Sequence, residues 1–139
     1  MATSEDHLKM SEWYYKKSNA YFQTAELSKE LEDKVGYFAL SAECLLASVD
    51  HLMGWFTRCD EFTSRKGRRN SFMYHKKIKK LGFGKKNKLM QFIIEAESVR
   101  NTIFYLHSTD LSEVEYISKS KLKLLLRRYE YVYRVIREL

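Results

Sequence analysis

The stretch from Arg100 to His107 carries two side chains that can handle a phosphate and a proton. Arginine binds phosphate oxygens through two parallel hydrogen bonds, and histidine gains or loses a proton near neutral pH. If residues 86–107 form one helix, both side chains fall within its apolar arc, at the seven-residue spacing of a heptad. Two charge-capable groups would then point at a neighbouring element, where packing alone favours apolar residues. We therefore expect Arg100 and His107 to belong to a site.

A purely structural explanation also fits these two residues. Arg100 would reach the rim of the fold or pair with an acidic residue. His107 would stabilise the carboxyl end of its helix, where a positive charge is favourable. The elements around the two residues bear on this choice.

The composition indicates an all-α protein with one core. The 139 residues contain no proline and only five glycines, and 45% of them are hydrophobic. At this length a single domain over residues 1–139 is expected. No apolar run reaches the roughly 20 residues of a membrane span, and the polar, acidic N-terminus differs from a signal peptide. We expect a cytoplasmic protein with no membrane partner.

The apolar pattern predicts an antiparallel four-helix bundle with an inserted basic loop and short helix. The first helix spans 4–31 and opens at Thr3 or Ser4, and the second spans 35–60. The third spans 86–107. A capping box formed by Ser112 and Glu115 predicts the start of the last helix. On the second helix the expected core positions are Phe38, Ala42, Leu45, Val49, Leu52 and Phe56.

The cysteines and histidines lack the spacing of metal ligands. Cys44 and Cys59 are expected on one helix, where about 22 Å of helical rise would separate them and prevent a disulfide. The histidines are scattered at positions 7, 51, 75 and 107. We therefore expect no metal site and no cofactor.

Positive charge is concentrated in one segment. Between Glu61 and Glu95 there are eleven lysines and arginines and no acidic residue, so the rest of the chain is net acidic, since the whole carries +7. A short helix is expected there around 73–81. Aromatic residues interleave with the charges, which is typical of surfaces that contact RNA, although a solvated loop can have the same composition. The residues assigned to RNA binding are Arg65, Lys66, Arg68, Arg69, Lys76 and Lys77.

The helix that carries Arg100 is apolar on a second face as well, through Met90, Ile94 and Tyr105. A helix with two apolar faces needs two partners. In a small bundle the simplest second partner is another copy of the same chain. We therefore expect a homodimer whose two-fold interface brings two copies of Arg100 and two of His107 toward one cleft.

The chain resembles the HEPN superfamily, whose members are small helical bundles that include many ribonucleases and toxin components. Arg100 and Asn101, followed by five residues and His107, are similar to the family's signature of arginine, polar residue, spacer and histidine. The alanine-rich segment 37–47 resembles the family's second helix, and the resemblance covers nearly the whole chain. Where many toxin members carry a tyrosine that a nucleotidyltransferase modifies, this chain has Thr109.

The resemblance implies metal-independent cleavage of RNA, in which a 2′-hydroxyl attacks its neighbouring phosphate. Two copies of His107 would act as base and acid, and Arg100 would stabilise the transition state. Asn101 would bind the phosphate or orient the histidine. Glu43 and Asp50 either face the same cleft or form an exposed acidic pair. The implied protein is a toxin or defence effector with RNA as its substrate, and a neutralising protein would be a further partner.

Two other functions are compatible with the same sequence. A non-catalytic HEPN-like module would bind a nucleotide or a protein, with Arg100 on a phosphate and His107 in a structural role. A helical adaptor would bind nucleic acid through its basic segment alone, and Arg100→Ala would then leave RNA affinity almost unchanged. Incubation with mixed RNA separates the ribonuclease from the binding module.

Overall fold

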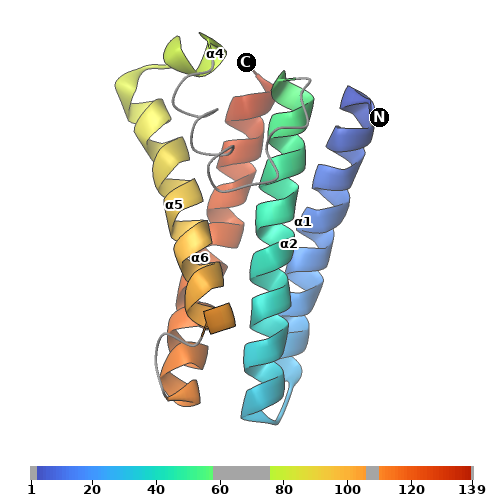
Figure 1. The fold of residues 1–139 in the computed structure, drawn as a ribbon, viewed down its shortest axis with the longest axis vertical. Coiled ribbons are helices and arrows are strands. Elements are labelled where there is room, and N and C mark those ends of the chain that lie inside the picture. Colours follow the sequence, from blue (N-terminus) through green and yellow to red (C-terminus); the bar gives the residue numbers. More distant parts are fainter. Residues whose placement is uncertain (1–2, 58–75, 106–109, 139) are drawn as a thin grey trace.

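The computed structural model describes residues 3–57, 76–105 and 110–138, and all regular structure within them is helical. The elements are α1 (Ser4–Leu27), α2 (Leu31–Thr57), the one-turn α4 (Lys76–Lys79), α5 (Phe83–Tyr105) and α6 (Leu111–Arg137). Figure 1 shows the four long helices side by side in alternating directions, with α4 at the end where α5 begins. This confirms the expected all-α helical bundle. None of the described helices is long and apolar enough to cross a membrane.

The helix starts follow local capping chemistry. Thr3 is the N-cap of α1, as expected: its hydroxyl accepts from the Asp6 amide at 3.1 Å, while the Asp6 carboxylate accepts from the Thr3 amide at 3.0 Å. The predicted capping box at Ser112 is wrong. Asp110 is the N-cap of α6 instead, because its extended backbone lets its carboxylate accept from the Ser112 amide at 2.9 Å.

The link between α1 and α2 lies earlier in the chain than the sequence suggested. Helix α1 ends at Leu27 rather than near residue 31, because Ser28 adopts an extended backbone. The Lys34 ammonium donates to the carbonyls of Ala25 and Glu26 at 3.3 and 3.1 Å, which satisfies the open end of α1. Lys34 can do so because α2 already begins at Leu31.

Helices α1 and α2 pack closely because serines lie where the two helices face each other. Ser18 and Ser41 exchange hydrogen bonds, each hydroxyl donating to the other residue's carbonyl at 2.7 and 2.8 Å. Seven residues along, the Ser48 hydroxyl donates to the Ser11 carbonyl at 2.6 Å. All four side chains are buried. Small side chains allow the backbones to approach, and the two pairs fix the antiparallel register of α1 against α2.

The core is built from buried side chains of all four long helices. All six positions expected to be buried on α2 are buried: Phe38, Ala42, Leu45, Val49, Leu52 and Phe56. The largest buried side chain is Tyr129 of α6, whose ring stacks on Tyr15 with ring centres 4.4 Å apart. Its hydroxyl lies 2.9 Å from Ser11 Oγ and 2.5 Å from Ser48 Oγ. The network joins α1, α2 and α6 and satisfies the buried phenol.

Candidate functional site

Arg100 of α5 faces α2, where its Nη1 donates to Glu43 Oε1 at 2.9 Å. The side chains are partly accessible, with 26% of Arg100 and 42% of Glu43 exposed. The Nε atom of Arg100 is buried and has no hydrogen-bond partner in the described part of the chain. Since a guanidinium has five N–H donors, the ion pair holds Arg100 in place without using up its capacity to bind an anion.

The ion pair shows which of the two acidic residues predicted near the site, Glu43 and Asp50, contributes to it. Glu43 lies at the α2–α5 contact and pairs with Arg100, so it is part of the site's surroundings rather than an isolated surface acid. Asp50, two turns further along α2, is half-buried.

A third acidic residue, Glu97, was not singled out in the sequence. Its side chain is only 2% exposed. Glu97 precedes Arg100 by three positions and therefore lies on the same side of α5. A signal was present, since Glu97 follows Ile93 by four residues and therefore lies in the apolar stripe of the helix. Burial of a carboxylate beside Arg100 makes this part of α5 more polar than its periodicity suggests.

The remaining predicted site residues are placed only in part. Asn101 is half-buried on α5, beside Arg100. His107 follows Tyr105, the last residue of α5, by two positions and lies outside the described residues. Of the expected RNA-binding residues, Lys76 and Lys77 form the start of α4. The other four, Arg65, Lys66, Arg68 and Arg69, also lie outside the described residues, as does Cys59.

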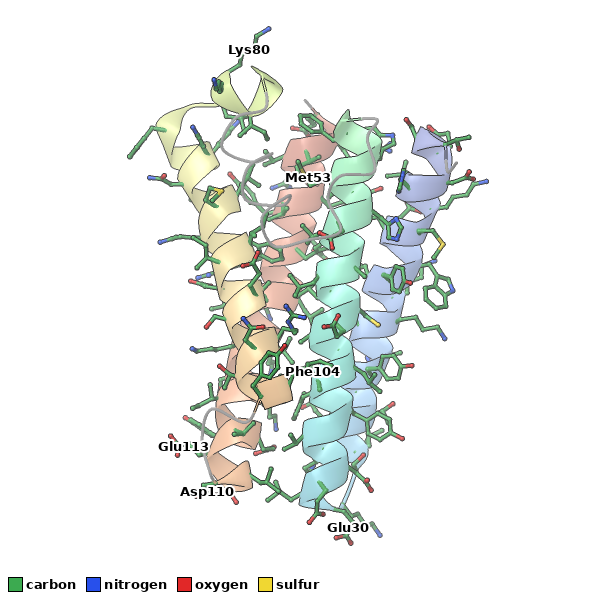
Figure 2. The ribbon with its side chains drawn as sticks, in the orientation of Figure 1. Glu30, Met53, Lys80, Phe104, Asp110 and Glu113 are labelled. Carbon is green, nitrogen blue, oxygen red and sulfur yellow. The ribbon has the colours of Figure 1, made fainter. Side chains whose placement is uncertain are left out.

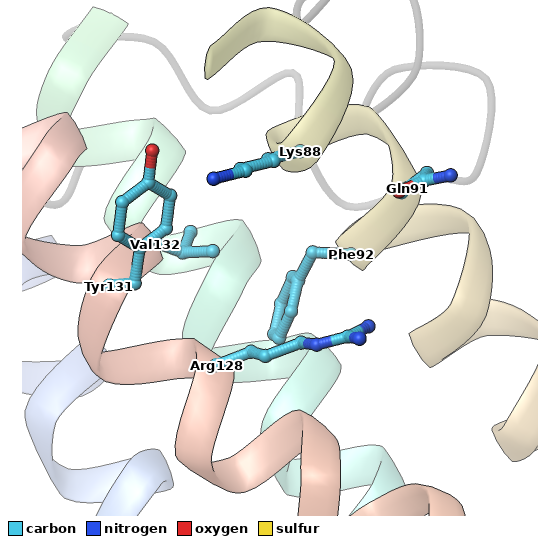
Figure 3. A pocket seen from close by; sticks show the side chains of 6 residues that line it. All are labelled: Lys88, Gln91, Phe92, Arg128, Tyr131 and Val132. Carbon is cyan, nitrogen blue, oxygen red and sulfur yellow. The ribbon is translucent and has the colours of Figure 1, made fainter. Parts of the chain in front are cut away.

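A pocket of about 300 Å³ lies between α5 and α6. Its lining consists of Lys88, Gln91, Phe92, Arg128, Tyr131 and Val132 (Figure 3). The Lys88 ammonium points toward Tyr131 and lies 5.5 Å from its ring centre, a cation–π arrangement. Arg128 donates to Glu95 at 2.9 Å. Of the two basic lining residues, Lys88 belongs to the basic segment and Arg128 does not, so the sequence did not reveal this pocket.

The expected second apolar face of α5 is partly accessible in the single chain. Ile94 is 43% exposed and lines a shallow hollow with Leu124 of α6. Tyr105 is more exposed, whereas Met90 packs against the core. Phe104, which the sequence did not single out, lies on the exposed front of α5, one turn after Arg100 (Figure 2). Apolar surface is therefore accessible both beside Arg100 and toward α6.

No family model matches the chain, and no curated protein or solved structure is detectably similar to it. The resemblance to the HEPN superfamily accordingly depends on the Arg100–His107 motif and the alanine-rich segment of α2.

Proposed function

We propose that this protein is an endoribonuclease that cleaves RNA without a metal ion. The observation that carries the proposal is the position of Arg100: it is held by Glu43 at the α2–α5 contact, partly accessible, on the helix that precedes His107. An arginine fixed in this way is suited to bind a phosphate and to offset the charge that develops on it during cleavage.

The proposed reaction is an intramolecular transfer of the phosphate. The 2′-oxygen of one nucleotide attacks the adjacent phosphorus while a histidine takes its proton, and the 5′-oxygen of the next nucleotide leaves with a proton from a second histidine. The products are a 2′,3′-cyclic phosphate and a free 5′-hydroxyl. DNA lacks the attacking hydroxyl and is not cleaved.

Each chain supplies one His107 and one Arg100, whereas the proposed reaction uses two histidines. We therefore include a homodimer in the proposal, with the two sites meeting across a two-fold axis. The exposed Phe104 and Tyr105 support this arrangement, because they leave apolar surface next to the motif. A second copy that covers this surface would bring its own His107 close to Arg100.

Glu43 is a positioning residue in this scheme. Its carboxylate orients the guanidinium through one hydrogen bond, and the partial exposure of both side chains leaves the pair accessible to an RNA phosphate. A fixed donor stabilises a transition state better than a mobile one, because less reorganisation is needed during the reaction. Asn101 is adjacent and would contribute a further hydrogen bond to the phosphate.

The test is the incubation of purified protein with single-stranded RNA in the presence of EDTA. We expect cleavage products that end in a 2′,3′-cyclic phosphate, and Arg100→Ala and His107→Ala should each lower turnover by at least about 10²-fold. Arg128→Ala is a matched control, because it removes an arginine with an equally short ion pair to Glu95. RNA that stays intact with the wild-type dimer, or activity lost in EDTA, contradicts the proposal.

A further inference from the structure

Two histidines that lie 44 positions apart meet between α1 and α2. Nδ1 of His7 lies 3.0 Å from Nδ1 of His51, with the ring centres 5.2 Å apart and the ring planes inclined by 37°. Both residues are half-buried. The register that pairs Ser11 with Ser48 also brings position 7 opposite position 51, so the spacing of histidines along the sequence gave no sign of the pair.

Neighbouring residues restrict both imidazole rings. The Tyr14 ring stacks on His51, with ring centres 5.5 Å apart and planes within 9° of parallel. Gly54 lies against His7, and a Cβ atom at this position would come within 3.0 Å of His7 Nδ1. The glycine therefore leaves the space that the imidazole occupies. Because the rings are already positioned, less conformational freedom is lost when a ligand binds between them.

We propose that His7 and His51 bind a divalent transition-metal ion of the zinc or copper class through their two Nδ1 atoms. Imidazole nitrogens are preferred ligands of these ions. Two nitrogens bound to one tetrahedral zinc, each at about 2.0–2.1 Å, lie about 3.3 Å apart. The observed 3.0 Å requires only a small separation of the rings.

The two imidazole rings can bind a metal ion without any change in their total number of protons. Without a metal, one Nδ1–H donates to the other Nδ1, which accepts through its lone pair. A metal ion needs the lone pairs of both Nδ1 atoms, so the proton of the donating ring moves to its Nε2 and both rings stay neutral. No redox step is involved, and water completes the coordination of the ion.

The site would be open to water, and its role would be to connect two helices. Within the described residues, no group of three or more histidine, cysteine or acidic side chains could hold a metal ion. Two protein ligands leave coordination positions for water, so binding is weaker than in a closed structural zinc site. His51 lies eight positions after Glu43, about 12 Å further along α2. The ion would therefore connect α1 to α2 at a distance from Arg100, and this inference does not depend on the proposed ribonuclease activity.

The experiment is a calorimetric titration of the full chain with zinc chloride, and separately with copper chloride, at pH 7.5. We expect one ion per chain for at least one of the two metals. His7→Gln and His51→Gln should each weaken that binding at least about 10-fold, because glutamine keeps a polar side chain but is a poor transition-metal ligand. His107→Gln is the matched control and should bind like the wild type.

Two further measurements distinguish the loss of a metal ligand from poor folding of a variant. In the wild-type protein, the imidazole NMR signals of both His7 and His51 should shift when zinc is added. The melting temperature should rise with zinc in the wild type and in His107→Gln, but not in His7→Gln. The proposal is overturned if the wild type binds neither ion, if His7→Gln binds the same ion with unchanged affinity, or if zinc that binds to the protein leaves both imidazole signals in place.

Discussion

Glu43 Oε1 accepts a hydrogen bond from Arg100 Nη1 at 2.9 Å, across the contact between α2 and α5. The two residues are 57 positions apart in the chain. The carboxylate fixes the guanidinium and also offsets part of its positive charge. Substitutions of Glu43 therefore separate the geometric contribution of the pair from its electrostatic contribution.

Glu43→Gln should retain most of the RNA turnover, because the amide oxygen of glutamine can accept the same hydrogen bond from Arg100. Glu43→Ala should lower turnover about 10-fold, because the guanidinium loses its orientation. Glu95→Ala, which removes the partner of Arg128, is the control and should leave turnover unchanged. Steady-state kinetics with saturating RNA distinguishes the variants. Equal losses in Glu43→Gln and Glu43→Ala would show that charge, and not orientation, is what Glu43 supplies.

The chain should sediment as a homodimer at micromolar concentration, with twice the mass of the 16.6 kDa chain. Ile94→Glu and Phe104→Glu should shift the equilibrium toward monomer, because both residues expose apolar surface that a second copy would cover. Leu27→Glu, at an exposed position at the end of α1, is the control and should leave the mass unchanged. A wild-type protein that sediments as a monomer removes the composite site.

Neutralising Arg65, Lys66, Arg68 and Arg69 together should weaken RNA binding and flatten its dependence on salt. Each lost phosphate contact lowers the slope of log K against log salt by about 0.7 for single strands. Turnover with saturating RNA should change much less, because these residues would hold the substrate equally before and during the chemical step. Fluorescence anisotropy over a salt series measures the slope. If affinity and slope stay at the wild-type values, the segment 65–69 is an ordinary solvated loop.

Tyr133 should lose its proton at a higher pH than an ordinary tyrosine. Burial, together with its hydrogen bond to Glu12 at 2.7 Å and the charge of that carboxylate, raises the pKa of Tyr133 to about 12. Because the folded state favours the protonated phenol, the resulting stabilisation is present below the ordinary tyrosine pKa of 10.0 and is lost as pH rises toward 12.

Comparison of wild type with Tyr133→Phe measures this effect. The free energy of unfolding of the wild type should fall more steeply between pH 10 and 12 than that of the variant. In an absorbance titration of phenolate, the variant should lose the amplitude of one late-titrating group. Identical pH profiles for the two proteins would mean that Glu12 does not hold the phenol.

Ser48→Val should destabilise the fold more than Ser48→Ala. Alanine removes hydrogen bonds to the Ser11 carbonyl and the Tyr129 hydroxyl, at a cost of about 1–3 kcal/mol. Valine removes the same bonds and also places extra methyl groups where α1 and α2 are in close contact, which adds about 1–3 kcal/mol. Urea denaturation gives both values. If the two variants are equally stable, the α1–α2 contact has room that the structure does not indicate.

The sequence by itself determined which segments are helical. The absence of proline, the apolar spacing from Phe38 to Phe56 and the polar start at Thr3 predict α1 and α2 from local chemistry. Such signals act within a few residues, because helical hydrogen bonds and caps join neighbours in the chain. Even there, competition between adjacent caps decided the boundary, as Asp110 did in place of Ser112.

The tertiary structure alone decided which side chains meet across helices. The spacing of apolar residues shows that α2 has a buried face, but it does not tell which residue of another helix lies opposite each position. That depends on the register between helices, which the buried pair of Ser18 and Ser41 fixes for α1 and α2. Contacts between distant residues, such as Glu43 with Arg100 and His7 with His51, exist only once this packing is set.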